Sequence, residues 1–143
     1  SDKSNEQINK MIIDLLKSLD LLSTKDLKVG NPLDKTISGG QRKRLNIGLE
    51  ILREPAVIFM DEPTSGLDVM ASRAIVDLIK SCREEGKTVI FSTHRMGEVN
   101  QVCDDIAMIY KGKLCYNNTL DQFKSEMTQP TFEEEFIHRV GKM

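Results

Sequence analysis

The feature that most limits the fold of this chain is a run of five apolar residues, Ala56 to Met60, that ends in two adjacent carboxylates, Asp61 and Glu62. The run is short, wholly apolar and rich in β-branched residues, a pattern typical of a strand buried on both faces of a parallel sheet. Ligands bind at the carboxyl ends of such strands. Asp61 and Glu62 therefore stand where a site is expected.

Periodicity and helix caps predict that helices and strands alternate along the chain. The expected N-caps are Ser38, Asp68, Thr119 and Thr131, and all but Asp68 have the spacing of a capping box. Strands that alternate with helices indicate an α/β fold with a mainly parallel sheet. The expected helices are 5–22, 38–54, 69–85, 96–103 and a helical tail after 119; the expected strands are 56–60 and 88–92, with a hairpin of 106–110 and 114–116; residues 23–37 are expected to be loop.

Composition excludes several classes of protein. The 143 residues fit one domain, and 20 Lys and Arg against 22 Asp and Glu leave a net charge of −2, which argues against a nucleic-acid partner bound through bulk positive charge. Three cysteines without a CxxC pair do not form a disulfide framework or a zinc knuckle. No apolar run approaches the roughly 20 residues of a membrane helix. The chain opens on Ser1 rather than Met, so we expect a piece of a longer protein.

The pair Asp61 and Glu62 suits two different tasks. One carboxylate can hold hydrated Mg²⁺, a hard cation that prefers oxygen ligands, and the other can accept a proton from an attacking water. The alternative is an acidic strand terminus that faces solvent and has no catalytic role.

Two further elements can face an anion. Ser38-Gly39-Gly40-Gln41 opens a helix with a capping serine and two glycines, and helix N-termini attract phosphate. An ordinary capped helix explains this segment equally well. His94, just past the strand 88–92, can donate a hydrogen bond to the same anion, although a lone histidine is more often structural.

The order of three segments carries a specific resemblance. Residues 37–41, then 59–68, then 92–94 resemble the signature motif, the Walker B strand with its D-loop, and the switch histidine of the nucleotide-binding domains of ABC-type ATPases. The resemblance covers residues 5 to about 116. It implies an α/β fold made of a partial P-loop NTPase core, with parallel strands and flanking helices, plus the ABC helical subdomain. The implied divisions are 1–54 for the helical subdomain, 55–118 for the second part of the core and 119–143 for a helical tail.

The resemblance also implies roles for individual residues. Asp61 would position Mg²⁺ through water, Glu62 would be the general base for ATP hydrolysis, and His94 would contact the γ-phosphate. These roles agree with the needs of phosphoryl transfer, which are positioning and charge neutralisation.

The implied partners are a second nucleotide-binding domain in a head-to-tail dimer and a transmembrane permease domain or subunit, at the cytoplasmic face of a membrane. Ser38 and Gly40 would contact the γ-phosphate of the nucleotide held by the opposing subunit. Asp68, with Ser65 and Gly66, would cross the dimer interface. The nucleotide-binding residues implied are Ser38, Gly39, Gly40, Gln41 and Asp68.

One family motif is missing from the sequence. A P-loop reads G-x-x-x-x-G-K-[ST], and the nearest segment, Gly30–Thr36, has Asp34 where the second glycine belongs. Its first glycine is also one residue too close. We therefore expect the chain to be the second part of such a domain and to be inactive by itself, with ATP hydrolysis a property of the longer protein.

Residues 42–50 and 64–68 resemble the pigment and sterol exporter subfamily and its bacterial relatives. Gln41 stands where that subfamily often has Glu, and Ser92–Arg95 is the commoner bacterial form, so a bacterial exporter is expected. Two other functions remain open. One is a soluble, non-transport ABC ATPase of translation or DNA repair, and the other is a degenerate domain that only binds a partner; intact Asp61 and Glu62 weigh against the latter.

Overall fold

The structure is a computed structural model that describes residues 3–30 and 36–141. Most of the segment compared with a P-loop, Gly30–Thr36, lies outside the described residues. The chain divides into two units, Ser1–Ser92 (unit 1) and Thr93–Met143 (unit 2). No helix among the described residues combines the length and the apolar composition that crossing a membrane requires.

Unit 1 opens with helix α1, Asn5–Ser18, followed by the 3-10 turn η1, Leu22–Thr24. The predicted helix 5–22 is thus four residues too long. It ends early because Asp20 adopts a positive φ of 54° and because Leu19 and Leu21 turn into the core, where they are 1% and 2% exposed. A capping box of Ser4 and Gln7 begins α1, and the sequence analysis missed it although the spacing was present.

Helix α2, Gly39–Ile51, begins as predicted, because Ser38 is its N-cap. The Ser38 hydroxyl accepts the Gln41 N–H at 3.1 Å, and the Gln41 side-chain carbonyl accepts the Ser38 N–H at 2.8 Å. Helix α2 packs on α1 at Gly48, where a Cβ would lie 2.7 Å from Leu19 Cδ1. A side chain at position 48 would therefore require the side chains of Leu19 and Leu15 to shift.

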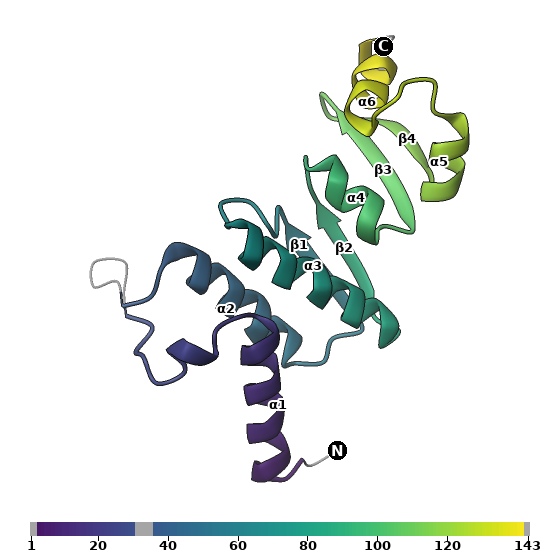
Figure 1. Cartoon of the computed structure of the whole chain (residues 1–143). Coiled ribbons are helices and arrows are strands. Elements are labelled where there is room, and N and C mark those ends of the chain that lie inside the picture. The colour runs from purple at the N-terminus through teal and green to yellow at the C-terminus, as the bar shows by residue number, and fades with distance from the viewer. Residues whose placement is uncertain (1–2, 31–35, 142–143) are drawn as a thin grey trace. The chain divides into compact units, whose positions relative to one another are not determined.

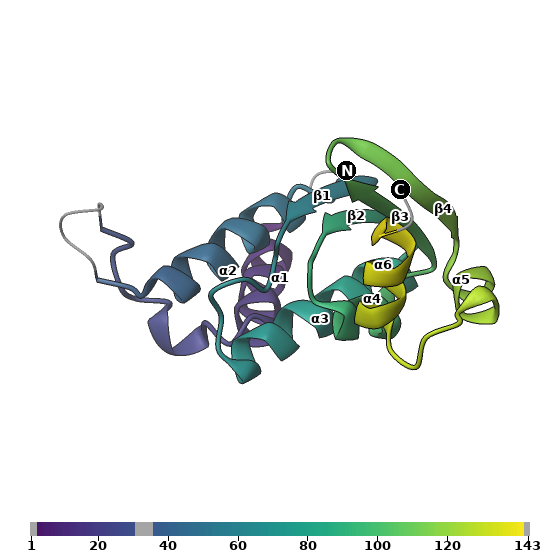
Figure 2. The same ribbon diagram turned by 90° about the horizontal axis from the view of Figure 1, so that it is seen from above.

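The core of unit 1 is a pair of parallel strands, β1 (Val57–Asp61) and β2 (Thr88–Ser92), joined through helix α3 (Val69–Glu84). Asp68 caps α3 by accepting the Ala71 N–H at 2.8 Å. Figures 1 and 2 show α3 along one side of the strand pair, and its apolar face supplies buried core residues: Ala71, Ile75, Val76, Leu78, Ile79 and Cys82. The predicted strand–helix–strand order and the parallel pairing are confirmed.

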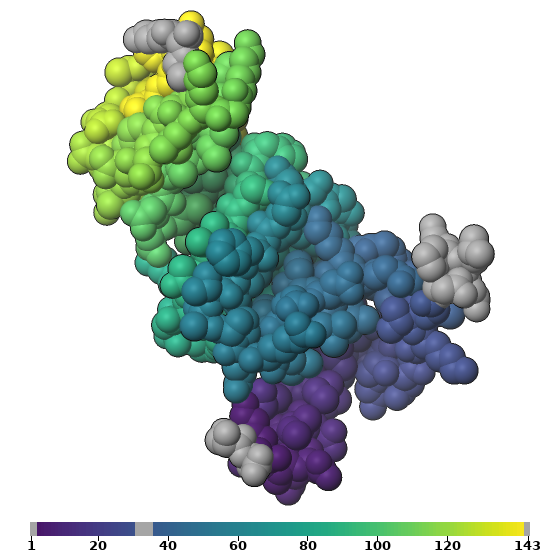
Figure 3. Space-filling view, turned by 180° about the vertical axis from the view of Figure 1, so that it is seen from behind, coloured from purple at the N-terminus to yellow at the C-terminus, as the bar shows by residue number. Residues whose placement is uncertain are grey.

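Burial of these strands on both faces is not observed. Ile58 is 5% exposed on the face toward α3, whereas Phe59 and Ile90 are 75% and 51% exposed. Figure 3 views unit 1 from the side opposite α3. The prediction was wrong for the described residues because, among them, one layer of helix covers one face of the pair.

Unit 2 contains helix α4 (Met96–Val102), the antiparallel hairpin β3 (Asp105–Tyr110) and β4 (Lys113–Thr119), and helices α5 (Leu120–Glu126) and α6 (Phe132–Gly141). The predicted hairpin and helical tail are confirmed, and β4 continues to the N-cap of α5. The helices cover the hairpin through one apolar cluster. Its fully or mostly buried members are Val99, Ile106, Met108, Leu120 and Phe123.

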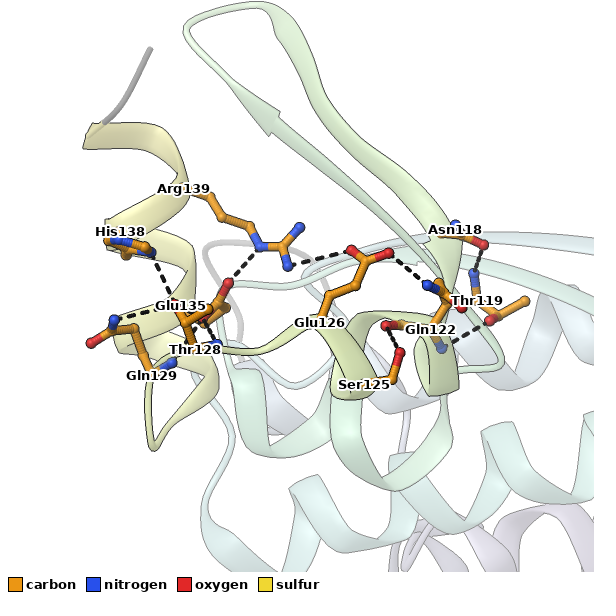
Figure 4. Close-up of polar contacts among 10 residues, drawn as sticks. All are labelled: Asn118, Thr119, Gln122, Ser125, Glu126, Thr128, Gln129, Glu135, His138 and Arg139. Carbon is orange, nitrogen blue, oxygen red and sulfur yellow. Dashed lines mark hydrogen bonds and ion pairs between the residues drawn. The ribbon is translucent and has the colours of Figure 1, made fainter.

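A buried carboxylate of α6 fixes the segment that connects α5 to α6 in unit 2 (Figure 4). Glu135 is 2% exposed and accepts the backbone N–H groups of Thr128 and Gln129 at 2.7 and 3.0 Å. Arg139 Nε donates to its other oxygen at 2.7 Å. The Arg139 guanidinium also lies 4.6 Å from the centre of the Tyr116 ring. The segment between the two helices is therefore held by one carboxylate, both of whose oxygens accept hydrogen bonds.

Candidate functional site

The acidic pair stands at the carboxyl end of the parallel strands, as the sequence predicts. Asp61 is the last residue of β1, and the register pairs it with Ser92, the last residue of β2. Ser92 Oγ donates a hydrogen bond to Asp61 Oδ1. The Glu62 N–H donates to Ser92 Oγ at 3.0 Å and lies 3.2 Å from Ser92 O. Ser92 thus orients both acidic residues.

The backbone at Glu62 is unusual, since its φ is 45°. Residues other than glycine seldom adopt this left-handed conformation, and functional sites are where such geometry is concentrated. It directs the chain from β1 into a turn in which the Ser65 N–H donates to Glu62 O at 3.0 Å. Pro63 and Thr64 in this turn are fully buried. Glu62 is therefore half-buried in a tightly fixed turn.

The donor set at this edge fits Mg²⁺ in the way that ion is usually held. Mg²⁺ takes one or two carboxylates, keeps several waters and completes its shell with phosphate oxygens. Asp61 supplies one such carboxylate at the end of β1. Among the described residues no cluster of three or more His, Cys, Asp or Glu forms a cage that would hold a metal by protein groups alone.

The glycine-rich segment forms the amino end of α2, as predicted. Gly39 and Gly40 are its first two residues, and nothing lies within 4 Å of a Cβ placed on Gly39. A Cβ on Gly40 would lie 3.2 Å from Leu67 Cδ2, so α2 packs here against the turn that follows β1. Gly39 is exposed at this end of α2, and the helix dipole there favours an anion.

His94 belongs to unit 2, where the residues on both sides of it are fixed. Thr93 Oγ1 donates to Glu98 Oε2 at 3.0 Å, and Arg95 forms an ion pair with Glu98 Oε1 at 3.2 Å. Glu98 is 8% exposed, so this carboxylate is a buried anchor for the segment before α4. The sequence did not point to Glu98, because a charged residue in a short helix is expected to be exposed to solvent.

Two residues of unit 1 were also missed. In the sequence, Ser92 was noted only as a strand end and as part of the segment 92–95, and Lys43 only within the segment 42–50. Lys43 Nζ in fact donates to Glu62 O at 2.6 Å and to Ser65 O at 2.9 Å. The register of β1 on β2 would have pointed to Ser92, whereas no local signal marks Lys43.

Comparison with known proteins identifies a family model and several relatives that match most of the chain. Residues 6–100 match the family model described as "AAA domain, putative AbiEii toxin, Type IV TA system". The chain belongs to this AAA-domain family, and its relatives are ABC transporters. The "Broad substrate specificity ATP-binding cassette transporter ABCG2" of Mus musculus is 37% identical over 79% of the chain. The "ABC transporter G family member 13" of Arabidopsis thaliana is 36% identical over 81% of it.

Solved structures of ABC ATPases share the fold. The ATP-binding subunit of an ABC transporter matches 96% of the chain with a TM-score of 0.76 at 21% identity. The ADP conformation of an ATP-binding cassette of an ABC transporter matches 95% of it with a TM-score of 0.67 at 25% identity. The predicted α/β class of P-loop NTPase core and the predicted resemblance to ABC nucleotide-binding domains are confirmed.

The relatives also qualify the prediction. They are G-family transporters of mammals and plants, which confirms the exporter subfamily, whereas a bacterial origin stays a prediction. The chain spans 17% of the length of each of these two relatives and 56% and 52% of the two solved chains. The matched region is therefore one segment of each of these longer proteins.

Proposed function

We propose that this chain is part of the ATP-hydrolysing domain of an ABC exporter, in which ATP binding and hydrolysis drive transport across a membrane. The observation that carries the proposal is the pair Asp61 and Glu62 at the carboxyl end of two parallel strands, oriented by Ser92. The segments around the pair resemble the Walker B strand and the D-loop of ABC-type ATPases.

Within this proposal Glu62 is the general base and Asp61 positions Mg²⁺ through water. When bound, Mg²⁺ neutralises charge on the phosphates of ATP. The carboxylate of Glu62 accepts the proton of the attacking water, which makes the water a stronger nucleophile. His94 donates a hydrogen bond to the γ-phosphate. The divisions 1–54, 55–118 and 119–143 remain the proposed subdomains.

The partners proposed are a second nucleotide-binding domain and a transmembrane permease, at the cytoplasmic face of the membrane. Ser38, Gly39, Gly40 and Gln41 serve the nucleotide bound by the opposing subunit. The exposed Gly39 at the amino end of α2, where the helix dipole favours an anion, supports this role. Asp68 follows Ser65 and Gly66 in the proposed D-loop, although its carboxylate already caps α3.

Ser38→Ala in the full-length transporter is expected to lower the rate of ATP hydrolysis by roughly 10- to 100-fold, the range for losing a hydrogen bond to a charged group. ATP affinity of the isolated subunit that carries the change should stay unchanged, because the serine serves the opposite site. Steady-state phosphate release and equilibrium ATP binding measure the two quantities. An equal loss of affinity in the monomer would contradict this role.

Two variants separate catalysis from helix capping. Ser4→Ala removes the matching capping box of α1 and should lower stability by about 0.5–2 kcal/mol without changing hydrolysis. Ser38→Gly retains most of the stability of a capped helix but lacks the hydroxyl, so it should hydrolyse ATP as slowly as Ser38→Ala.

The 143-residue chain by itself is expected not to bind Mg-ATP measurably. Asp61 and Glu62 can only accept hydrogen bonds. The sequence contains no P-loop motif, whose lysine and backbone N–H groups hold the phosphates. Isothermal titration with Mg-ATP tests this, and micromolar affinity would show that the segment Gly30–Thr36 was misinterpreted.

A further inference from the structure

Lys43 connects the two functional segments of unit 1. It lies in the second turn of α2, and its ammonium donates to Glu62 O at 2.6 Å and to Ser65 O at 2.9 Å. An ammonium has three donors, so Lys43 can satisfy both carbonyls at once. Both acceptors belong to the turn that carries the proposed general base.

These contacts complete the immobilisation of the backbone on both sides of Glu62. Its N–H is bonded to Ser92, and its carbonyl accepts both the Ser65 N–H at 3.0 Å and Lys43. The left-handed φ of 45° at Glu62 is one that a residue with a Cβ rarely holds without such support. The direction in which the Glu62 carboxylate leaves the backbone is therefore set jointly by Ser92 and Lys43.

We propose that Lys43 is a positioning residue for ATP hydrolysis, which holds the Glu62 turn in its productive geometry. The proposal rests on the proposed function, in which Glu62 is the base. Lys43 is on the same helix as Ser38, which serves the nucleotide of the opposing subunit.

The kinetic test compares Lys43→Met with wild type in the full-length transporter. Methionine retains an apolar side chain of similar length but has no donor, and a misplaced catalytic group loses up to about 100-fold in rate. We expect kcat to fall 10- to 100-fold while KM for ATP changes less than twofold. Lys43→Arg, which retains charge and donors, should have an intermediate kcat.

The matched control is Lys10→Met, on the exposed side of α1, which removes one positive charge and should leave kcat unchanged. If Lys43→Met does not fold, Lys43→Gln replaces it with the same expectation, because its amide is too short to reach both carbonyls. Wild-type kcat in the folded variant would overturn the proposal.

A double-mutant cycle distinguishes positioning from general destabilisation. In a Glu62→Gln background, Lys43→Met should cause no further loss of kcat, because Lys43 acts through Glu62. A full additional 10- to 100-fold loss would overturn the proposal. If Glu62→Gln itself turns over ATP at the wild-type rate, the proposed function fails instead, independently of Lys43.

A second readout does not depend on hydrolysis. Amide hydrogen exchange at Ser65 and Leu67 should accelerate at least 10-fold in Lys43→Met and stay at the wild-type rate in Lys10→Met. Unchanged exchange in a folded Lys43→Met protein would show that the turn holds its geometry without Lys43.

Discussion

Replacing Glu62 by Gln in the full-length transporter is expected to lower kcat for ATP hydrolysis by about 10²–10⁴-fold, the usual contribution of a general base. The amide retains the size of the side chain but cannot take a proton from water. Mg-ATP affinity should stay within a few-fold of wild type, since Asp61 and the backbone of the turn are unchanged. Single-turnover phosphate release and equilibrium nucleotide binding separate the two effects.

The control for this variant is Glu84→Gln, the same chemical change at an exposed position near the end of α3. It should leave both rate and affinity unaltered. Phosphate release by Glu62→Gln at close to the wild-type rate would remove Glu62 from the role of base. Asp61→Asn is expected to behave differently, with a weaker dependence of nucleotide binding on Mg²⁺.

Local sequence signals were sufficient for the starts of most elements. Ser38, Asp68 and Thr119 each cap the helix they were expected to cap, because the hydroxyl or carboxylate accepts the N–H three residues on. The end of α1 was not predictable in this way. Leu16 and Leu19 continue the helical period, and the left-handed turn at Asp20 follows from burying Leu19 and Leu21 in the tertiary structure.

The acidic pair could be predicted, but its supports could not. Asp61 and Glu62 are marked by adjacency to an apolar strand. Ser92 is 31 residues from Asp61 and Lys43 is 19 residues from Glu62, so their contacts depend on strand register and on how α2 packs. The spacing of residues along the sequence specifies neither the register of the strands nor the packing of α2. The same reasoning explains the exposed Phe59. The apolar sequence of a strand indicates that burial of both faces is favourable, but it does not tell which faces other described residues pack against.

Unit 2 offers the clearest case of a residue whose sequence context misleads. Glu133, Glu134 and Glu135 open α6 together and resemble a solvated acidic turn suited to a helix N-terminus. Glu135 alone is buried and fully bonded, while its two neighbours are exposed. Sequence does not distinguish the three, because the difference arises from the path of residues 127–131.

Glu135→Ala is expected to destabilise unit 2 by about 3–5 kcal/mol, the usual effect of removing one partner of a buried ion pair. The change leaves the N–H groups of Thr128 and Gln129 without their acceptor and Arg139 without its closest anion. Thermal unfolding of the 143-residue chain and amide exchange over residues 120–141 measure the loss. Glu133→Ala, at an exposed position of the same turn, should change stability by less than about 0.5 kcal/mol.

The same carboxylate predicts how the stability of unit 2 depends on pH. Burial by itself raises the pKa of Glu135, but hydrogen bonds from the Thr128 N–H, Arg139 and the Gln129 N–H outweigh it and lower the pKa from 4.5 to about 2. Above pH 4.5 the group is ionised in both the folded and the unfolded chain, so its full stabilisation is present. As pH falls from about 4.5 to 2, Glu135 becomes protonated in the unfolded chain but stays ionised in the folded chain, and this stabilisation is lost.

The difference in unfolding free energy between wild type and Glu135→Ala should therefore be constant near neutral pH and shrink as pH falls from about 4.5 to 2. A difference that persists undiminished at pH 2 would show that packing, rather than the ionised carboxylate, holds α5 to α6.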